Sequence, residues 1–454
     1  MERCTKRQML QLLGQAGGVA IAFLTACRAE RPTGPAAQPG AAPAPRAKIS
    51  FATWGDLTGA LTEAYERQLK RFQQQNSTIE VEFFIAPFAE YRTQLFALLA
   101  ADQPYTLFVS GNYWTFELSG NEALLELTDR VKRDLDTSKL SPVAVRSGTD
   151  YTGKIWGVAR TANVAVLYYN KEHFDQAGLP YPNENWSYDD VLRAARQLTR
   201  EELGRYGWYA RNFISSDWVP LTHSWGGGFI DPKDWTRMTV NRPENVEALQ
   251  WAVDAIHRYR VAPTVEVERA LNEKYGTEGP FSGGHVAMMN GIDQVGFWGK
   301  GLLETLRFDV TYVPRGPKAR KSAAPTHHYV IPRSVQPDAA EAAWRLMKFL
   351  LLDLEAHVDV AVGIRFMPML KAAYDDPRIR KRPLPPDNMK AFIDPLVQGW
   401  ADDIDVNGVW SKWTEIVGRQ LSLAWRGEKT VKAALDEAQP LCQQAADEFY
   451  KSRK

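Results

Sequence analysis

Hydrophobic and polar residues follow one another along the chain in a pattern that predicts strands and helices in turn. Residues 49–53, 80–85 and 105–109 are rich in β-branched and aromatic side chains and predict three strands. Between them, apolar residues recur near the 3.6-residue period, from Leu61 to Leu69 and again over residues 91–101, and predict two helices. A β-α-β-α-β order predicts a parallel, doubly wound α/β sheet, in which ligands lie outside the carboxyl ends of the strands. The loops at residues 54–56 and 110–114 are therefore expected at a ligand crevice.

The pattern begins again after residue 160 and ends in an amphipathic helix. Residues 164–169 predict a strand. Ser187, with Asp190 three residues later, predicts the capped N-terminus of a further helix. Residues 431–445 carry an apolar stripe that predicts a docked C-terminal helix, with a kink at Pro440.

The N-terminus carries the features of an export signal. Arg3, Lys6 and Arg7 precede an uncharged apolar stretch over residues 12–26, which is shorter than the ~20 residues that a membrane-spanning helix needs. Leu24-Thr25-Ala26-Cys27 resembles a bacterial lipobox, in which a peptidase cuts before the Cys and the Cys is then acylated. The resemblance implies a signal peptide over residues 1–26 and a lipid anchor on Cys27. It also implies an exported protein held on the outer face of a bacterial membrane, at the cell surface or in the periplasm.

Two features of this region concern how the protein is exported and how it is held. Residues 5–10 resemble a twin-arginine signal with Lys6 in place of the first Arg, so the sequence leaves the export route open. Residues 27–47 are expected to form a tether: residues 28–47 hold five Pro and seven Ala and no aromatic side chain. Such a composition cannot bury enough apolar surface to offset the entropy of ordering. In polyproline form, at ~3.1 Å per residue, this tether would reach roughly 60 Å.

Length, charge and cysteine content narrow the classes of function. Removing residues 1–26 takes three basic and one acidic residue from 55 and 54, which leaves a net charge of −1 and no excess of positive charge for a nucleic-acid partner. The stretch from residue 48 to 454 exceeds a single hydrophobic core and predicts two domains. Cys442 is the one cysteine left beyond Cys27, so we expect no disulfide and a buried thiol on the last helix.

Several stretches resemble, in order, family 1 extracellular solute-binding proteins of bacterial ABC importers. The longest is YYNKEHFDQAGLPYPNENWSYDDVLRAARQLT, from Tyr168 to Thr199. Others are YTGKIWGV at residues 151–158, WGGGF at residues 225–229 and FSGGHVAMM at residues 281–289, followed by Ala343-Trp344, Phe349-Leu350, Gly363 and Pro368. The resemblance covers nearly all of residues 48–454.

The resemblance implies two α/β lobes joined by a hinge, each with a mainly parallel sheet flanked by helices. On this basis residues 48–160 and 280–326 are assigned to lobe 1, and residues 161–279 and 327–454 to lobe 2. A mono- or oligosaccharide would be captured between the lobes by hinge closure and delivered to the transmembrane subunits of an ABC transporter. The resemblance implies a monomer with no catalytic residue, no metal site and no cofactor.

Candidate ligand-binding residues follow from the chemistry of sugars, whose C–H faces stack on aromatic rings and whose hydroxyls bind carboxylates, amides and Arg. The best stacking candidates are Trp54, Trp114, Trp225 and Trp410, while Trp413 competes with Trp410 and Tyr168, Tyr169 and Trp344 are expected in the core. The polar candidates are Asp56, Glu90, Asn112, Asp293 and Arg365.

The chain departs from the family pattern at two places. Pro104 is followed by Tyr105 where the family usually has Asp, and Ile292-Asp293 stands where many sugar binders carry a Trp. Asp293 would offer a carboxylate to hydroxyls or to a cation, which argues against a phosphate or sulfate ligand. Arg365 instead favours a phosphate or sulfate ligand, unless it forms an ion pair within the protein.

Other classes of function remain open. A secreted glycosidase would also be rich in Trp and carboxylates, but needs two carboxylates at a defined separation. The chain lacks G-x-S-x-G, H-E-x-x-H and Walker motifs. His327 and His328 are adjacent and would point to opposite faces of a strand, which argues against joint metal binding. A binder of glycerophosphodiesters, polyamines or peptides, and a receptor that kept the fold without transport, are further alternatives.

Overall fold

The computed structural model of this 454-residue chain describes residues 47–55, 59–276, 279–293, 304–382, 385–402 and 405–451. The predicted signal peptide, the lipidation site Cys27 and the tether up to residue 46 lie outside the described residues. The predicted ligand residue Asp56 lies outside them as well.

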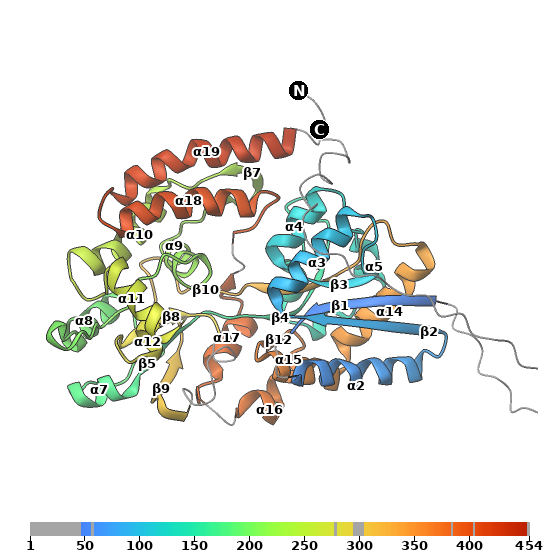
Figure 1. Cartoon of the computed structure of the whole chain (residues 1–454), viewed down its shortest axis with the longest axis horizontal. Coiled ribbons are helices and arrows are strands. Elements are labelled where there is room, and N and C mark those ends of the chain that lie inside the picture. The colour runs from blue at the N-terminus through green and yellow to red at the C-terminus, as the bar shows by residue number, and fades with distance from the viewer. Residues whose placement is uncertain are drawn as a thin grey trace, which may run out of the picture. The chain divides into compact units, whose positions relative to one another are not determined.

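The larger sheet has six strands in the order β12-β4-β11-β3-β1-β2 (Figure 1). These strands are β1 (Ala47–Trp54), β2 (Ile79–Ala86), β3 (Leu107–Gly111), β4 (Val158–Ala162), β11 (Thr326–Val330) and β12 (Met367–Pro368). β1 is parallel to β2 and β3, whereas β11 is antiparallel to β3 and β4, and β12 is antiparallel to β4. The predicted β-α-β-α-β order is confirmed, because α2 (Ala60–Gln75) and α3 (Phe88–Ala100) connect the three parallel strands.

Helices cover both faces of this sheet. α2 buries the predicted stripe of Leu61, Tyr65 and Leu69, and it contacts α14 (Pro337–Leu352) and α15 (Leu354–Ile364) on one face. Figure 1 shows α3, α4 (Asn112–Gly120) and α5 (Thr128–Asp134) on the other face. In this arrangement α3 and α4 begin at the carboxyl ends of β2 and β3.

The second sheet has three strands in the order β8-β5-β9. They are β5 (Val166–Asn170), β8 (Met288–Gly291) and β9 (Phe308–Thr311), and β5 is antiparallel to both neighbours. The expectation of a mainly parallel second sheet is therefore wrong for these strands. The strands that pair with β5 are separated from it by residues 171–287, which form several helices and a hairpin instead of a single βαβ crossover.

The helices around the second sheet come from two separate parts of the chain. They are α7 (Lys171–Ala177), α8 (Tyr188–Leu198), α9 (Val219–Ser224), α10 (Pro243–His257), α11 (Val265–Tyr275), α12 (Gly279–Ser282), α18 (Trp410–Trp425) and α19 (Val431–Lys451), with the hairpin β6 (Ile230–Asp231) and β7 (Asp234–Met238). The predicted capping box is confirmed, because the Ser187 side chain accepts from the Asp190 N–H and the Asp190 carboxylate accepts from the Ser187 N–H. Cys442 is buried on α19, as expected, and α19 continues through Pro440.

Strand pairing differs from the predicted lobe boundaries at two places. β8, in the segment 280–326 that was assigned to lobe 1, pairs with β5 in the second sheet. β11, in the segment 327–454 assigned to lobe 2, pairs with β3 and β4 in the first sheet. We use lobe 1 for the elements on the six-stranded sheet and lobe 2 for those on the three-stranded sheet. The chain returns to lobe 1 at residue 326, because β11 (Thr326–Val330) pairs with both β3 and β4 inside the first sheet.

Short elements lie where the chain passes between the sheets. β10 (Ser322–Ala323) and β13 (Ala401–Asp402) form a parallel pair. α17 (Lys390–Gln398) contacts both β13 and α6 (Pro142–Arg146), and α16 (Pro377–Arg380) packs on α15. Three connections between the lobes are therefore described: from β4 to β5, through β10, and through β13.

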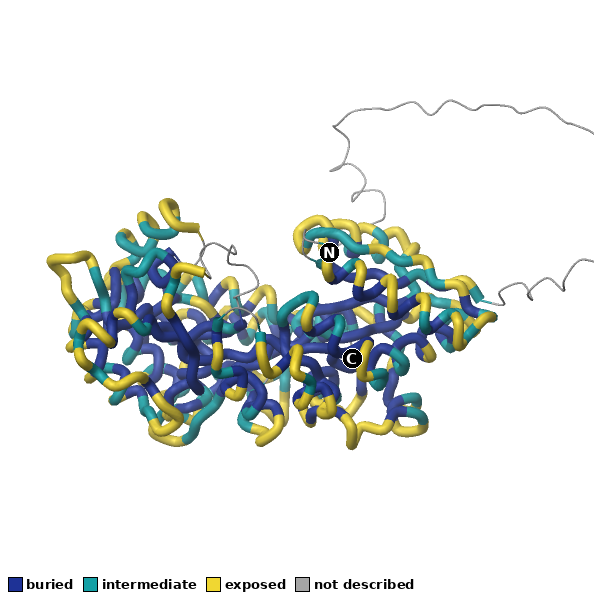
Figure 2. Tube along the Cα trace, turned by 90° about the horizontal axis from the view of Figure 1, so that it is seen from below, coloured by how far each residue is buried: buried dark blue, intermediate teal, exposed yellow. Residues whose placement is uncertain are grey.

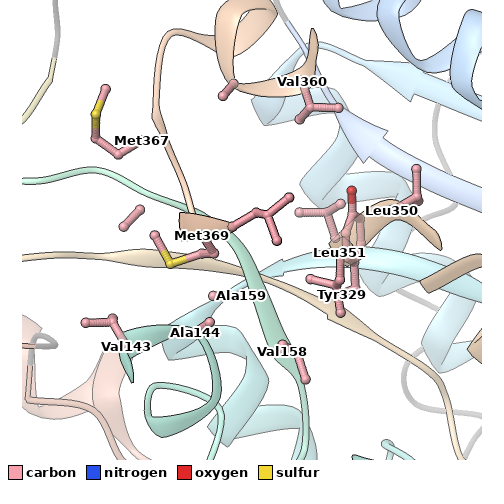
Figure 3. Packing of buried hydrophobic residues seen from close by; sticks show 14 of the residues in the cluster. Val143, Ala144, Val158, Ala159, Tyr329, Leu350, Leu351, Val360, Met367 and Met369 are labelled. Atoms are coloured by element: carbon pink, nitrogen blue, oxygen red, sulfur yellow. The ribbon is translucent and has the colours of Figure 1, made fainter. Parts of the chain in front are cut away.

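Buried side chains are concentrated in the interior, and Figure 2 shows buried segments running through the middle of the trace with exposed turns at its outside. Figure 3 shows Tyr329 of β11 with Leu350 and Leu351 of α14, and Met369 near Ala159. β5 serves two cores, because Val166 and Tyr168 join one cluster while Leu167 and Tyr169 join the other, as the two-residue period of a strand requires. The expectation that Tyr168, Tyr169 and Trp344 are core residues is confirmed. Among the described residues, none of the helices is both long and apolar enough to span a bilayer.

Candidate functional site

Aromatic side chains gather at the carboxyl ends of β1, β2 and β3. Trp54 ends β1, Phe88 begins α3 after β2, and Trp114 lies in the first turn of α4 after β3. The rings of Trp54 and Trp114 contact edge to face at 5.9 Å, and Phe88 lies nearly flat on Trp114, with centroids 5.4 Å apart and ring planes 15° apart. The structure thus brings together Trp54 and Trp114, two of the predicted stacking residues.

The three rings differ in exposure and therefore in role. Trp54 and Trp114 are 7% and 2% exposed, so they form a packed base, whereas Phe88 is 44% exposed. The ring available for stacking on a sugar is therefore that of Phe88, which the sequence reasoning missed. The sequence feature that could have identified Phe88 was its position. It lies just after a predicted strand of the parallel sheet, at the edge where the ligand crevice was expected.

A second row of rings continues from Trp54 along lobe 1. The His327 ring contacts the Trp54 ring at 5.2 Å and stacks on Phe366, with centroids 5.0 Å apart and ring planes 25° apart. Burial, with the positive charge of Arg160 and the neighbouring His328, holds the pKa of His327 well below its usual range. His327 therefore presents a neutral ring at neutral pH, suited to packing and to hydrogen bonds rather than to charge.

Arg160 is a buried cation behind these rings. Its side chain on β4 is 1% exposed, with the guanidinium 5.7 Å from the Trp54 ring, and one N–H donates to the Tyr65 hydroxyl. Within the described residues, its Nε and Nη2 have no hydrogen-bond partner. A buried guanidinium without a described carboxylate holds positive charge near the carboxyl end of β1, because Arg does not lose its proton in proteins.

Two aromatic contacts of α4 join the lobes, and one of them is between Phe116 and Trp235 of β7, with ring centroids 4.8 Å apart. Tyr113 of α4 and Trp410 of α18 stack with centroids 4.4 Å apart and ring planes 22° apart. Next to them, a Glu117 carboxylate oxygen accepts a hydrogen bond of 2.8 Å from the Ser411 N–H in the first turn of α18. An anion at a helix N-terminus is stabilised by the unpaired N–H groups there. Trp410 is half-buried, while Trp413, its competitor, is fully buried and belongs to the core.

Asp293 and Arg365, two of the predicted ligand residues, lie in one charged cluster. The Asp293 carboxylate, 1% exposed, forms an ion pair of 2.8 Å with Arg382, which also donates to the Arg365 carbonyl oxygen. Burial and the neighbouring Arg382 lower the pKa of Arg365. The cluster holds two cations and one anion, so its net charge is positive, and Asp293 is already committed to Arg382.

A cavity of about 710 Å³ lies in lobe 2, between α11, the end of α18 and residues 209–213. Phe213 lines it and is 43% exposed, while Tyr209 and Trp425 line it and are buried. The polar groups that line it are Arg211, Asn212, Glu268, Arg269, Asn272, Glu273, Ser422 and Arg426. Exposed ring faces beside amides and charged groups are the chemistry that binds sugars, and the volume falls in the ~300–1,000 Å³ range of ligand pockets. None of the residues predicted from the sequence lines this cavity.

Arg211 is fixed at the edge of this cavity by a short π-helix. Its guanidinium donates to the Ser216 hydroxyl at 2.5 Å and pairs with Asp217 at 3.1 Å. Ser216 and Asp217 lie in the π-helix Ile214–Trp218, a rare element that recurs at functional sites. The Arg211 guanidinium also lies 5.9 Å from the Phe213 ring, which holds that exposed ring in place.

The remaining predicted residues are scattered. Glu90 is exposed in the first turn of α3, two residues from Phe88, and Asn112 is fully buried at the start of α4. Trp225 is half-buried at the end of α9, with its ring against Tyr188 at 5.2 Å. Trp225 therefore has one ring contact within lobe 2 and does not join the aromatic rows of lobe 1.

A histidine whose side chain is 12% exposed joins α9 to the connection through β13. The His223 ring nitrogens lie 3.3 Å from an Asp402 oxygen and 3.2 Å from an Asp405 oxygen. Burial alone would lower the pKa of His223, but the carboxylates of Asp405 and Asp402 outweigh it and raise the pKa to about 10. Asp402 also forms an ion pair with Lys321, at a distance of 3.1 Å. His223 is thus a permanent cation at the connection between the lobes at neutral pH.

Comparisons with known proteins give the same fold. The Listeria monocytogenes ABC substrate-binding protein, solved with cycloalternan, superposes with a TM-score of 0.72 at 21% identity and covers 89% of this chain and 99% of its own. The cyclic alpha-maltosyl-1,6-maltose binding protein of Arthrobacter globiformis has a TM-score of 0.73 at 18% identity, covering 88% and 99%. At these identities the likeness concerns the fold, which is that of two-lobed binding proteins.

Sequence comparison assigns the family. The maltotriose-binding protein of Pyrococcus abyssi is 22% identical over 340 residues, which cover 73% of this chain and 69% of that protein. The sn-glycerol-3-phosphate-binding periplasmic protein of Rhizobium meliloti is 25% identical over 215 residues, covering 44% and 49%. The family profile described as bacterial extracellular solute-binding protein matches residues 55–353, which is well over half of the chain. The chain therefore belongs to the family of bacterial extracellular solute-binding proteins.

Proposed function

We propose that this protein captures a carbohydrate between its two lobes and delivers it to the transmembrane subunits of an ABC importer. The observation that carries the proposal is the Phe88 ring, which is 44% exposed and held nearly flat on Trp114. Such a preformed aromatic face, next to polar groups, suits the C–H face of a sugar ring. The maltotriose-binding relative and the cycloalternan complex support an oligosaccharide as the ligand.

We infer that each lobe contributes one wall to this proposed site. Lobe 1 offers Phe88 above its Trp base, and lobe 2 offers Phe213 and the polar lining of the 710 Å³ cavity. Tyr113 and Trp410 lie at the junction. Hinge closure on the ligand would bury these exposed rings, and the closed form would be the one that the transporter recognises. The protein itself makes and breaks no bond in this proposal.

The proposed mode of attachment rests on the sequence. Cys27 would carry the lipid, residues 28–46 would hold the folded part at a distance from the membrane, and the protein would act as a monomer. Replacing Cys27 with Ser tests the anchor: the variant should move from the membrane fraction to the soluble fraction. Retention of the variant in the membrane fraction would refute lipidation at Cys27.

The ligand class is tested by thermal melting of the purified protein with mono- and oligosaccharides. A ligand that binds only the folded state must raise the melting temperature, by RT ln(1 + [L]/Kd) in free energy. The positive cluster of Arg365 and Arg382 around Asp293 favours one alternative, a ligand with a phosphate group. A shift with a glycerophosphodiester and none with any sugar would replace the carbohydrate proposal by that alternative. Chromatography of the incubated oligosaccharide separates binding from hydrolysis, since a glycosidase would release products.

A further inference from the structure

A third group of residues forms a cavity that the proposed sugar site does not use. This cavity, about 420 Å³ in volume, lies between the turn before α8, the segment after β9, and α17 with Trp400. Three cations line it: Arg315, Arg320 and Lys390. It borders the connection through β13, because Trp400 directly precedes that strand.

Arg320 is held in one position by contacts on several sides. Its guanidinium lies 5.4 Å from the Tyr312 ring and 5.5 Å from the Trp400 ring. Its Nη2 donates to the carbonyl oxygens of Glu184 and Trp186. The charged group is therefore preorganised, which lowers the entropy that binding would otherwise cost.

The loop that carries these arginines is fixed to α9. Lys318 and Ala319 donate their N–H groups to the Ser224 carbonyl oxygen, and Lys321 donates its N–H to the Ser224 hydroxyl. At Arg315, the backbone N–H donates to the Trp186 carbonyl oxygen. The two guanidinium groups therefore project from a rigid backbone.

The positive charge of this cavity is only partly balanced. Within the described residues, neither Arg315 nor Arg320 forms an ion pair with a carboxylate, and Glu184 on the same wall offsets part of the charge of Arg320. Asp394 is occupied, because it accepts a hydrogen bond of 2.6 Å from the Tyr312 hydroxyl and lies 3.7 Å from Lys390. Burial and the neighbouring Arg315 lower the pKa of Arg320 to about 10. A lowered pKa means that the folded protein holds this charge at a cost, which a bound anion would relieve.

We propose that this cavity binds an oxyanion, the phosphate or sulfate group of a ligand, through Arg315, Arg320 and Lys390. Guanidinium groups present paired N–H donors that match the oxygens of such a group. The site is separate from the aromatic rows and from the cavity of about 710 Å³, so it does not depend on the proposed sugar function. Because it touches both lobe 2 and the β13 connection, an occupied site would stiffen that connection.

Inorganic phosphate is the first probe, added to the purified full chain at constant ionic strength against sodium chloride. Phosphate should raise the melting temperature more than chloride does, and the double variant R315Q/R320Q should lose this difference or bind about tenfold more weakly. The double variant R258Q/R345Q is the matched control, because it removes two exposed arginines elsewhere and changes the net charge equally. An equal phosphate effect in wild type and R315Q/R320Q, or none at tens of millimolar, would overturn the proposal.

A second variant keeps the test valid if loss of Arg320 impairs folding. Glu184 is an exposed carboxylate on the cavity wall, so E184Q should tighten phosphate binding without affecting the core. Weaker binding in E184Q would contradict the proposal. Sedimentation with phosphatidylglycerol or phosphatidylcholine vesicles identifies the source of the oxyanion. Selective binding to phosphatidylglycerol that R315Q/R320Q abolishes assigns a lipid headgroup; a phosphate effect without vesicle binding assigns a free solute.

Discussion

The rings of Tyr113 and Trp410 stack with centroids 4.4 Å apart and ring planes 22° apart, and they join α4 of lobe 1 to α18 of lobe 2. Both residues lie in the first turn of their helices, so each ring is positioned by the strand or connection that precedes it. The Glu117–Ser411 hydrogen bond fixes the same two helices one turn further along α4. These two contacts, together with that of Phe116 on Trp235, join the lobes in their relative position.

We expect this stack to couple the two residues energetically. Trp410→Ala should lower the free energy of unfolding by about 2 kcal/mol, because the ring is half-buried. In a double-mutant cycle with Tyr113→Ala, measured by urea denaturation, the coupling should be about 1 kcal/mol. Additive effects of the two substitutions would show that the stack carries no energy of its own.

Phe88 should matter for sugar affinity and little for stability. Phe88→Ala removes a ring that is 44% exposed, so we expect about tenfold weaker binding of the oligosaccharide that raises the melting temperature most. Phe84→Ala is the matched control, since Phe84 is 38% exposed on the same lobe but contacts Tyr105 instead of the Trp base. The measurement is calorimetric titration of both variants. Equal loss of affinity in the two would remove Phe88 from the site.

Because of His223, the free energy of unfolding should fall as pH rises through the alkaline range. Its folded pKa of about 10 lies above the ordinary value of 6.5, so the folded state binds the proton more tightly. The stabilisation is fully present below about pH 6.5 and is lost as pH rises toward 10. Urea denaturation at pH 6, 8 and 10 should show the wild type losing its advantage over His223→Asn as pH rises. A difference that stays constant over this range would contradict the assigned charge.

Asp293 should be a structural residue as much as a ligand residue. Asp293→Asn leaves Arg382 as a buried, unbalanced cation and should cost about 3–5 kcal/mol in free energy of unfolding. Replacing both partners, with Arg382→Met, should recover part of this loss, because no buried charge is then left alone. Thermal and urea denaturation of the three variants test this. A stable Asp293→Asn that no longer binds sugar would instead make Asp293 a direct ligand.

The sequence predicted regular elements well where local signals agree with long-range packing. The stripe of α2 and the Ser187–Asp190 capping box depend on residues within one helix, and both were confirmed. The lobe boundaries depend on which strands pair, and β8 and β11 each have partners more than one hundred residues away. No local pattern specifies such pairings.

In the candidate site, too, the sequence predicts some residues and not those that depend on long-range packing. Trp54 and Trp114 were found because carboxyl ends of parallel strands meet at one edge, and their rings do touch. Phe88 was missed because a Phe at a helix start looks like a core residue until its exposure is known. The cavity around Phe213 combines α11, the end of α18 and the segment before a π-helix, an arrangement that periodicity in the sequence does not predict. Asp293 was found as a candidate, but its partner Arg382 lies 89 residues away.

Calorimetric titration of the purified protein with maltotriose and related oligosaccharides, alongside glycerol-3-phosphate, tests the central claim most directly. The account predicts saturable binding of at least one oligosaccharide, weakened in Phe88→Ala and preserved in Phe84→Ala, with no release of products. Binding of glycerol-3-phosphate alone, with no heat from any saccharide, would contradict carbohydrate capture as the function of this protein.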